Sequence, residues 1–372
     1  MPVVIDDPRL VPIASKVEAG ERLSFDDGVQ LYRSTDILAV GYLANLVRER
    51  LHGNKTYFNV NRHINPTDVC VASCRLCAFG KHVRDPKAYT MSLDEVWHRA
   101  GEGWSEAVTE FHIVGGLHPE LTLDWYCEML RGLKQRFPQV HLKAFTMVEI
   151  AYLARRAKIS TRETLERLRD AGMDSMPGGG AEIFNERVRR IICDHKIDGN
   201  EWLETAREAH RLGLKSNCTM LYGHIENDED RADHLVKLRA LQDETRGFVT
   251  FIPLAFHPEN TALHHIAKTT GFADIRNIAV ARLMLDNIPH VKAYWVMMTP
   301  RIAQIALRFG ADDIDGTIVE ERIYHDAGAT TVQGLRRAEL LQLIHKAGRE
   351  AIERDTLYRP VQRTEATFTV LV

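Results

Sequence analysis

The sequence contains no long hydrophobic run and no marked excess of charge of either sign. None of its apolar stretches approaches the ~18 residues that a membrane-spanning helix needs, so we expect no membrane span. Its 48 basic and 51 acidic residues are mixed along the chain and give a formal net charge of -3. That balance creates no strong field for a nucleic acid or a membrane surface. We therefore predict neither of them as a partner.

Features of an export signal and of a modular chain are also missing. The sequence begins MPVVIDDP, without a basic region followed by an apolar one, so we expect a cytoplasmic protein. It has no repeats, no low-complexity segment and no linker rich in proline, glycine and serine. For 372 residues this favours one barrel-sized domain over two.

Cysteine is scarce, with six in the chain, which is too few for a disulfide-stabilised scaffold of this size. Three cysteines nevertheless lie together, at positions 70, 74 and 77. The other three lie apart in apolar or helical segments, where we expect small buried side chains or inert thiols: Cys127, Cys193 and Cys218.

Strand-like runs and amphipathic helical patterns alternate from Thr56 onward. About eight such units favour a closed parallel barrel over a doubly wound sheet. We therefore predict an α/β fold, a (β/α)8 TIM-type barrel. The predicted strands span residues 57–64, 110–114, 141–146, 175–177, 215–221, 248–255, 291–297 and 313–318.

Helices are predicted between these strands and also before them. An apolar stripe indicates helical structure up to Gly53, so we divide the chain into an N-terminal helical extension, residues 1–55, and a barrel domain with C-terminal helices, residues 56–372. The predicted barrel helices span residues 93–101, 123–137, 161–171, 201–212, 231–244, 275–287, 301–309 and 336–349.

The segment after the first predicted strand carries the clearest chemical signal. Cys70, Cys74 and Cys77 have Cys-x3-Cys-x2-Cys spacing, which brings three thiolates to one side of a short loop. Ordinary clusters have four cysteine ligands, so three would leave one iron of a four-iron cluster open to a substrate. A structural zinc site, with His82 as fourth ligand, is the alternative.

Glycines and carboxylates follow the next strands. The pair Gly115-Gly116 ends the second strand and indicates either close backbone approach to a ligand or a plain tight turn. A glycine run at 178–180 lacks the spacing of a phosphate-binding loop, so a backbone close to an adenosyl group is the better interpretation. Glu149 and Glu182 are candidates for ribose hydroxyls, with helix capping or solvation as the alternative.

Other polar residues at predicted strand ends are candidates for substrate contacts. His118 follows the second strand and either contacts a substrate carboxylate or hydrogen-bonds its own loop. Thr219 lies in the fifth strand, and His257 and Asn260 follow the sixth. Histidine on a strand is more often a core residue than a ligand, but His257 precedes a proline in a loop and is a stronger candidate.

The cysteine spacing resembles the signature of the radical S-adenosylmethionine (SAM) superfamily. Read in order, the segments at 61–65, 114–120, 175–182, 221–224, 255–258 and 310–317 are similar to the aminofutalosine synthase family of the futalosine route to menaquinone. Two sister families share this framework, the cyclic dehypoxanthinyl futalosine synthases and the deazaflavin-forming synthase subunit. Val114 and His257 favour the first family. Leu76, where an aromatic residue is usual, departs from the superfamily pattern.

This resemblance implies a radical SAM barrel and a particular reaction. A [4Fe–4S] cluster held by Cys70, Cys74 and Cys77 would chelate SAM through its open iron and cleave it. The adenosyl radical would add to the vinyl carbon of 3-[(1-carboxyvinyl)oxy]benzoate, and rearrangement and decarboxylation would give 6-amino-6-deoxyfutalosine and methionine. The implied electron donor is a flavodoxin or ferredoxin.

The resemblance and the strand-end positions together define two sets of site residues. The cofactor-binding set is Phe79, Gly115, Gly116, Glu149, Glu182 and Thr219. A substrate with two carboxylates needs cationic or hydrogen-bonding groups. Arg62 is one candidate for such a contact, and its alternative role is that of a salt-bridge residue on the outside of the barrel. The predicted catalytic set is Arg62, His63, His118, His257 and Asn260.

A zinc-stabilised binding protein without redox activity is the competing interpretation, and metal content separates the two. Anaerobic reconstitution with iron and sulfide is expected to give brown protein with about four irons and four sulfides per chain. Colourless protein that holds one zinc ion per chain would contradict the cluster.

Overall fold

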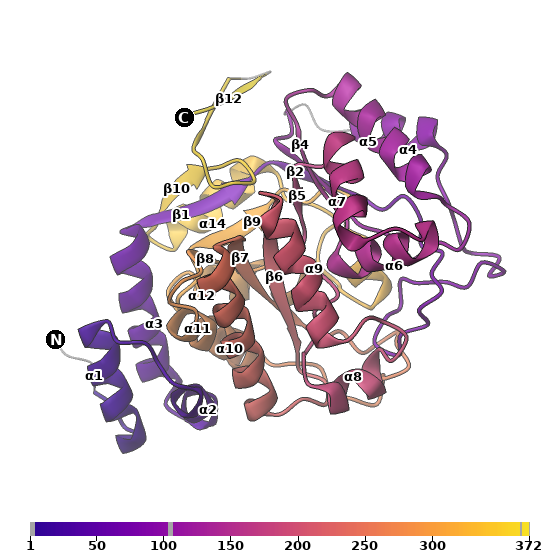
Figure 1. Cartoon of the computed structure of the whole chain (residues 1–372). Coiled ribbons are helices and arrows are strands. Elements are labelled where there is room, and N and C mark those ends of the chain that lie inside the picture. The colour runs from indigo at the N-terminus through magenta and orange to yellow at the C-terminus, as the bar shows by residue number, and fades with distance from the viewer. Residues whose placement is uncertain (1–3, 103–106, 365–366, 372) are drawn as a thin grey trace.

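Seven short strands, covered on both faces, form the centre of the molecule. Most of their residues are buried, as expected of a parallel sheet with helices on its outer face. Figure 1 shows these strands at the centre and the helices around them. The computed structural model describes residues 4–102, 107–364 and 367–371. The parallel sheet has the order β2 (Asn61–Ile64), β3 (Glu110–Ile113), β4 (His141–Ala144), β5 (Ser175–Met176), β6 (Lys215–Tyr222), β7 (Phe248–Ala255) and β8 (His290–Val291).

The eighth strand position is taken by β9 (Asp313–Gly316), which is joined to both edges of the sheet by single bridges. On one side Lys292, just after β8, pairs with Asp313. On the other side Arg62 of β2 pairs with Val319, just beyond β9. The ladder is continuous over seven strands and closes through β9, which confirms the predicted α/β barrel of the TIM type.

The first predicted strand, residues 57–64, is two strands. β1 (Lys55–Asn59) pairs in parallel with β9 and with β10 (Glu350–Glu353), outside the seven-stranded sheet. The chain then turns at Val60 into β2. Only Val60 separates the two strands and most of their residues are buried, so the sequence pattern does not show that they pair with different neighbours.

The helices begin where side chains cap them. Ser92, Thr122, Ser160 and Asp198 each accept a hydrogen bond from the backbone N–H three residues on, which satisfies a donor that the helix itself leaves unpaired. The barrel helices are α4 (Leu93–Gly101), α5 (Leu123–Arg136), α6 (Met147–Ala157), α7 (Thr161–Asp170), α8 (Glu186–Ile192), α9 (Gly199–Arg211), α10 (Asp228–Thr245), α11 (Gly271–Met284), α12 (Trp295–Ala306), α13 (Ile323–Asp326) and α14 (Arg337–Lys346).

Several predicted helix boundaries are shifted by a few residues, and α6 and α8 were not predicted; two of the wrong boundaries have a clear cause. Residues 295–297 form the first turn of α12 rather than the end of a strand, because a short, fully buried apolar run looks the same in a strand and in a buried helix. The chain is kinked within α12 at Thr299, whose φ is 73°, immediately before Pro300. The last predicted helix, to residue 349, ends at Lys346, where the chain turns into β10.

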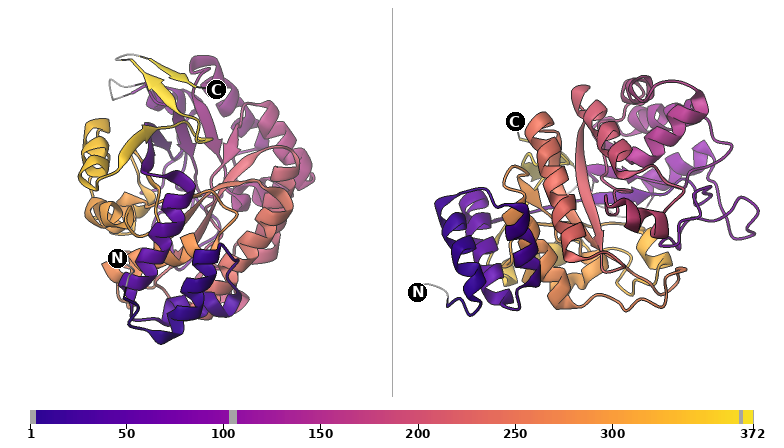
Figure 2. Two further views of the ribbon diagram at one scale, coloured as in Figure 1. Left: turned by 90° about the vertical axis from the view of Figure 1, so that its left-hand side faces the viewer. Right: turned by 60° about the horizontal axis from the view of Figure 1, so that its bottom comes forward.

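Three α-helices precede the barrel; the second and third pack against α10 and α11, and the first packs against the third (Figure 2). Arg239 of α10 donates to the carbonyl of Leu23 at 2.9 Å, and Arg276 of α11 donates to that of Tyr32 at 3.2 Å. We propose that the extension ends and the barrel begins at the turn before β1, close to residue 55. Residues 1–3, 103–106, 365–366 and 372 of these two regions lie outside the described residues. The three helices are α1 (Val11–Ala19), α2 (Phe25–Arg33) and α3 (Ile37–His52).

The segment after β10 closes the amino-terminal end of the barrel. Arg354 donates from Nε to Asp313 Oδ2 at 2.6 Å, and the Thr356 hydroxyl donates to Glu110 Oε2 at 2.8 Å. The ring of Tyr358 stacks on His290 with centroids 3.5 Å apart. Paired charges and stacked rings therefore fill this end of the barrel.

The last described residues form the antiparallel hairpin β11 (Val361–Arg363) and β12 (Phe368–Val370). Across the described ranges, the helices are all too short or too polar to cross a membrane.

Loss of one partner of the buried Arg354–Asp313 pair is expected to destabilise the barrel strongly. Arg354→Met leaves the Asp313 carboxylate buried without its cation, which is expected to lower the free energy of unfolding by about 3–5 kcal/mol. The matched control is Arg336→Met, because Arg336 and Glu339 form an exposed pair and such pairs contribute about 0–1 kcal/mol. Urea unfolding followed by circular dichroism measures both variants. Equal midpoints for the two would contradict this assignment.

Candidate functional site

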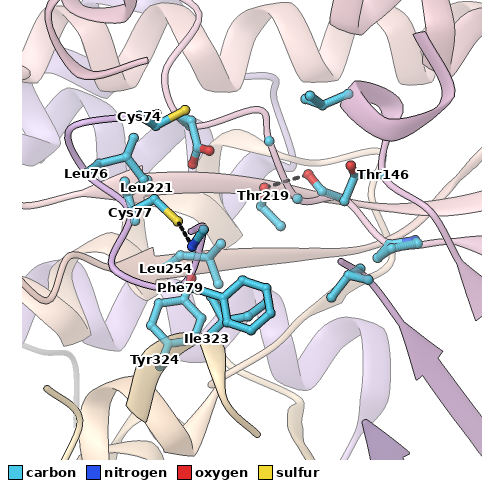
Figure 3. A pocket seen from close by; sticks show the side chains of 18 of the residues that line it. Cys74, Leu76, Cys77, Phe79, Thr146, Thr219, Leu221, Leu254, Ile323 and Tyr324 are labelled. Atoms are coloured by element: carbon cyan, nitrogen blue, oxygen red, sulfur yellow. Dashed lines mark hydrogen bonds between the residues drawn. The ribbon is translucent and has the colours of Figure 1, made fainter. Parts of the chain in front are cut away.

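A cavity of about 430 Å³ opens at the carboxyl ends of the strands and extends into the barrel. Figure 3 shows Cys74 and Cys77 on one side of it and Thr146 on the other, with Phe79, Ile323 and Tyr324 along one wall. Much of the lining is apolar, and polar groups are gathered at the cysteine loop and at the deep end. This is the usual position of active sites in barrels of this type.

The cysteine loop, residues 65–92, is held by its own hydrogen bonds. Asp68 accepts from Lys81 Nζ and from the Tyr89 N–H, both at 2.7 Å. The Cys70 N–H donates to the carbonyl of Lys81 at 2.8 Å. These contacts fold the loop back on itself, and all three of its cysteines line the cavity as half-buried free thiols: Cys70, Cys74 and Cys77.

The surroundings of the sulfurs fit a bound metal cluster. The Ala72 N–H donates to Cys70 Sγ at 3.4 Å and the Gly80 N–H to Cys77 Sγ at 3.3 Å, and such contacts stabilise thiolates. A Cβ at position 80 would lie 3.7 Å from both of these sulfurs. Burial raises the pKa of Cys74 to about 12 and that of Cys77 above its usual value. The thiols of Cys74 and Cys77 are therefore protonated until a metal replaces the protons.

His82 is not placed to serve as the fourth ligand of a structural zinc site. His82 is exposed, lies outside the cavity lining, and uses Nδ1 to accept the Arg84 N–H at 3.2 Å. The histidines that do line the described part of the cavity come from the strands and the loop after β7: His63, His112 and His257.

The Gly115-Gly116 pair allows two loops to approach each other closely. The Gly116 N–H donates to the carbonyl of Thr67 at 2.9 Å, and a Cβ at Gly116 would overlap the backbone of Val69. Both glycines line the cavity beside the cysteine loop. Their role is therefore close approach rather than a left-handed turn, and the same absence of side chains leaves backbone polar groups accessible to a ligand.

Glu149 joins this glycine pair to α6. Its carboxylate accepts the Gly115 N–H at 3.0 Å and the Thr146 N–H at 2.7 Å, the second as part of a capping box. Burial raises the pKa of Glu149 to about 7. Capping, the alternative considered from the sequence, is therefore one of its roles, and it lines the cavity as well.

Glu182 forms a largely buried ion pair that the sequence does not indicate. Its carboxylate lies 2.7 Å from Lys196 Nζ, and both residues line the cavity. Burial alone would raise the pKa of Glu182, but the Lys196 ammonium lowers it overall. Glu182 has a φ of 47°, a conformation that costs energy for a residue other than glycine and is common in functional sites. Lys196 follows α8 in a loop with no recognisable motif.

Thr219 and Phe79 also reach the cavity. The Thr219 hydroxyl donates to the carbonyl of Gly178 at 2.7 Å, which joins β6 to the glycine run after β5. Phe79 is buried in the wall next to the cysteine loop. All six residues of the predicted cofactor-binding set therefore lie around one cavity, although their roles remain predictions.

Three of the five predicted catalytic residues lie elsewhere. Arg62 points to the outer face of β2 and donates to the carbonyl of Glu102 at the end of α4. His118 uses Nδ1 to accept the N–H groups of Glu120 and Leu121, at 3.0 and 3.1 Å. Asn260 is exposed and donates to a carbonyl of α13. His118 therefore has the loop-bonding role that was its alternative, Arg62 lies on the outer face but bonds a carbonyl rather than a carboxylate, and none of the three lines the cavity.

His63 and His257 do line the cavity. His257 Nε2 lies 2.9 Å from the carbonyl of Met297 and therefore carries the proton, while its buried Nδ1 has no partner among the described residues. Burial lowers the pKa of both histidines. His257 thus presents an unused acceptor at the cavity, and a bound ligand is its natural donor.

The deep end of the cavity contains residues that the sequence analysis missed. His112, Lys143, Lys292 and Asp315 point inward and line it with His63. The signal was available in the alternation of strand residues, because positions 110 and 112 on β3 and 141 and 143 on β4 share one face. It was not usable without knowing which face of each strand points into the barrel.

Comparison with protein families finds two matching models. The model described as "Radical SAM superfamily" matches residues 64–238, and the model described as "CofH/MqnC C-terminal region" matches residues 245–367.

Three curated relatives resemble the chain over nearly its whole length. An aminodeoxyfutalosine synthase of Thermus thermophilus is 49% identical over 96% of this chain and 97% of its own. A second, from Streptomyces coelicolor, is 44% identical over 95% and 94%. A 5-amino-6-(D-ribitylamino)uracil–L-tyrosine 4-hydroxyphenyl transferase of Methanoculleus marisnigri is 41% identical over 94% and 97%.

Solved structures of low sequence identity share the fold. Methylornithine synthase has a TM-score of 0.69 at 15% identity and covers 91% of this chain and 97% of its own. The [FeFe]-hydrogenase maturase HydG of Carboxydothermus hydrogenoformans has a TM-score of 0.72 at 16% identity and covers 94% and 80%. These similarities support the barrel architecture alone.

The absent side chain at Gly80 is expected to matter for metal binding. In Gly80→Ala the new methyl group would lie 3.1 Å from Cys70 Cβ, a tight contact that requires Cys70 to move by a few tenths of an ångström. We expect iron to be lost to a chelator about 10-fold more readily than in the wild type, as for other residues that support metal ligands. Gly101→Ala is the control, because its nearest contact is an ordinary 3.4 Å to Phe137. Equal iron retention in the two variants would contradict the prediction.

Proposed function

The chain belongs to the radical SAM superfamily, and on this premise we propose that it acts as an aminodeoxyfutalosine synthase. Members of the superfamily carry a [4Fe–4S] cluster and use SAM. The identities of 49% and 44% to two synthases, over nearly the whole chain, support this activity above those of the sister families.

The cluster would be held by Cys70, Cys74 and Cys77. The observation that carries this assignment is that one self-bonded loop brings all three thiols to the edge of a cavity, and that His82 stays outside it. When bound, the cluster supplies the electron that cleaves SAM and releases its adenosyl group as a radical.

SAM would lie across the carboxyl ends of the strands, next to the cysteine loop. The side-chain-free backbone at Gly115-Gly116 is suited to the amino group of its methionine portion. Glu149 and Glu182 would accept hydrogen bonds from ribose hydroxyls, and Thr219 holds the glycine run beside the adenosyl portion. Phe79 and the neighbouring apolar wall would exclude water, which protects a reactive radical from side reactions.

The proposed substrate is 3-[(1-carboxyvinyl)oxy]benzoate, bound deeper in the barrel than SAM. In the overall reaction C5′ of SAM becomes bonded to the vinyl carbon, the product is rearranged onto the aromatic ring, and one carboxyl group is lost as CO2 or bicarbonate. The products are 6-amino-6-deoxyfutalosine and methionine. The residues that would position this substrate are His63 and His257, together with the polar groups of the deep end.

The remaining parts of the proposal concern the surroundings of the enzyme. A cytoplasmic location suits free thiols that must stay reduced until metal binds. A flavodoxin- or ferredoxin-type protein is the proposed electron donor.

Product mass tests the proposed function directly. Reconstituted wild-type protein with SAM, a reductant and the enolpyruvyl ether is expected to form a product that retains the adenosine carbons. Cys70→Ala is expected to abolish the product, because two cysteines no longer hold the cluster. Cys127→Ala, at a buried cysteine of α5 far from the loop in sequence, is the control and keeps activity.

Two outcomes would contradict this function. Release of 5′-deoxyadenosine without adduct formation would indicate a sister radical SAM enzyme. Full activity of Cys70→Ala would remove the cysteine loop from the reaction.

A further inference from the structure

Three neighbouring strands place titratable side chains side by side at the deep end of the cavity. His63 on β2 is in register with His112 on β3, and His112 is in register with Lys143 on β4. Residues in register on neighbouring strands point to the same side of a sheet, and all three line the cavity. The two imidazole rings are stacked, with centroids 4.5 Å apart and an angle of 18° between their planes.

The charged groups that face this histidine pair are already matched with one another. Lys143 Nζ lies 2.6 Å from Glu110 Oε1, and Lys292 Nζ lies 3.2 Å from Asp315 Oδ1. Glu321, the remaining facing charge, lies 2.9 Å from its own partner, His325. The deep end therefore has no surplus positive charge with which to receive an anion.

The histidine pair itself is free to bind a ligand. Within the described part of the chain, the ring nitrogens of His63 and His112 form no hydrogen bond to the protein, and both rings border the cavity. Burial lowers the pKa of both imidazoles, and for His112 the positive charge of Lys143 lowers it further. Both rings are therefore neutral in the ligand-free protein near pH 7.

The orientation of the proposed substrate follows from the bond that is made. C5′ of SAM joins the vinyl carbon, so the vinyl end must face the cysteine loop. The carboxylate on the aromatic ring is at the other end of the substrate and reaches the deep end of the cavity. A carboxylate there meets balanced charges and two unbonded imidazoles.

We propose that the His63–His112 pair, next to Lys143, binds the ring carboxylate of the substrate, and that binding takes up about one proton into the pair. This inference rests on the proposed function, and it assigns His112 a substrate-binding role that the sequence did not suggest. An adjacent carboxylate favours the imidazolium form, and two stacked rings do not both become charged, because like charges repel.

The direction of the pH dependence follows from this linkage. The free pair is neutral and the occupied pair is protonated, so the histidine pKa rises on binding. Affinity is therefore greatest below the pKa of the free pair, falls by about 10-fold per pH unit between the pKa of the free pair and that of the occupied pair, and is lowest and constant above the latter.

Binding of a truncated ligand tests the inference without turnover. Isothermal titration calorimetry would use the reconstituted, unreduced holoenzyme with SAM, with 3-ethoxybenzoate as the probe because it keeps the ring carboxylate and lacks the enol carboxylate. The enthalpy difference between phosphate and Tris buffers gives the number of protons taken up. We expect about one proton per bound probe near pH 7.5 and weaker binding at higher pH.

Variants of the two histidines test whether they are the groups that take up the proton. The double variant His63→Gln/His112→Gln is expected to lose proton uptake and the pH dependence, while the amides still offer hydrogen bonds. His345→Gln is the control, because His345 is exposed on α14. A second probe, 2-phenoxyacrylate, lacks the ring carboxylate and is expected to bind without proton uptake.

Clear results would overturn the inference. These are proton uptake that persists in the double variant, binding of 3-ethoxybenzoate without proton uptake in the wild type, or no binding of that probe. Because no reductant is present, the result is independent of product formation. Product without proton uptake removes this inference alone, whereas proton uptake without the expected product removes the proposed function alone.

Discussion

Every charge inside the barrel is constrained by the cost of leaving it unpaired. Arg354 lies against Asp313, Lys143 against Glu110, and Lys292 against Asp315. These pairs fill the amino-terminal end and the floor with charge that is balanced locally. These pairs leave the cavity polar but without a net charge. A charged ligand must therefore bind together with a counter-ion, or its binding must change the protonation of a group in the cavity.

The two ends of the cavity are built by different means. At the mouth, one loop folds on itself through Asp68 and brings three thiols together, with the Gly115-Gly116 backbone packed against it. At the floor, single side chains from several strands are brought together by register. A local loop suits a metal cluster, whose ligands must be close together, and rigid strands suit a substrate that must be held at a fixed distance from SAM.

Strand-end position was a poor guide to the individual site residues. Arg62 and His63 are neighbours in sequence, yet they point to opposite faces of β2, and only His63 reaches the cavity. His118 and Asn260 follow strands as expected, but backbone groups use their hydrogen-bonding atoms, from its own loop for His118 and from α13 for Asn260. Residues 295–297 were misread because a buried run has no period that separates strand from helix.

By itself, the sequence determined what depends on nearby residues: the alternation of strands and helices, their capping residues, and a loop with three closely spaced cysteines. Only the tertiary structure decided which side chains share the floor of the cavity and that Lys196 pairs with Glu182. The physical reason is that pleat and register set the direction of a strand side chain. Both are set by pairing with strands distant in sequence, and no local pattern contains that information.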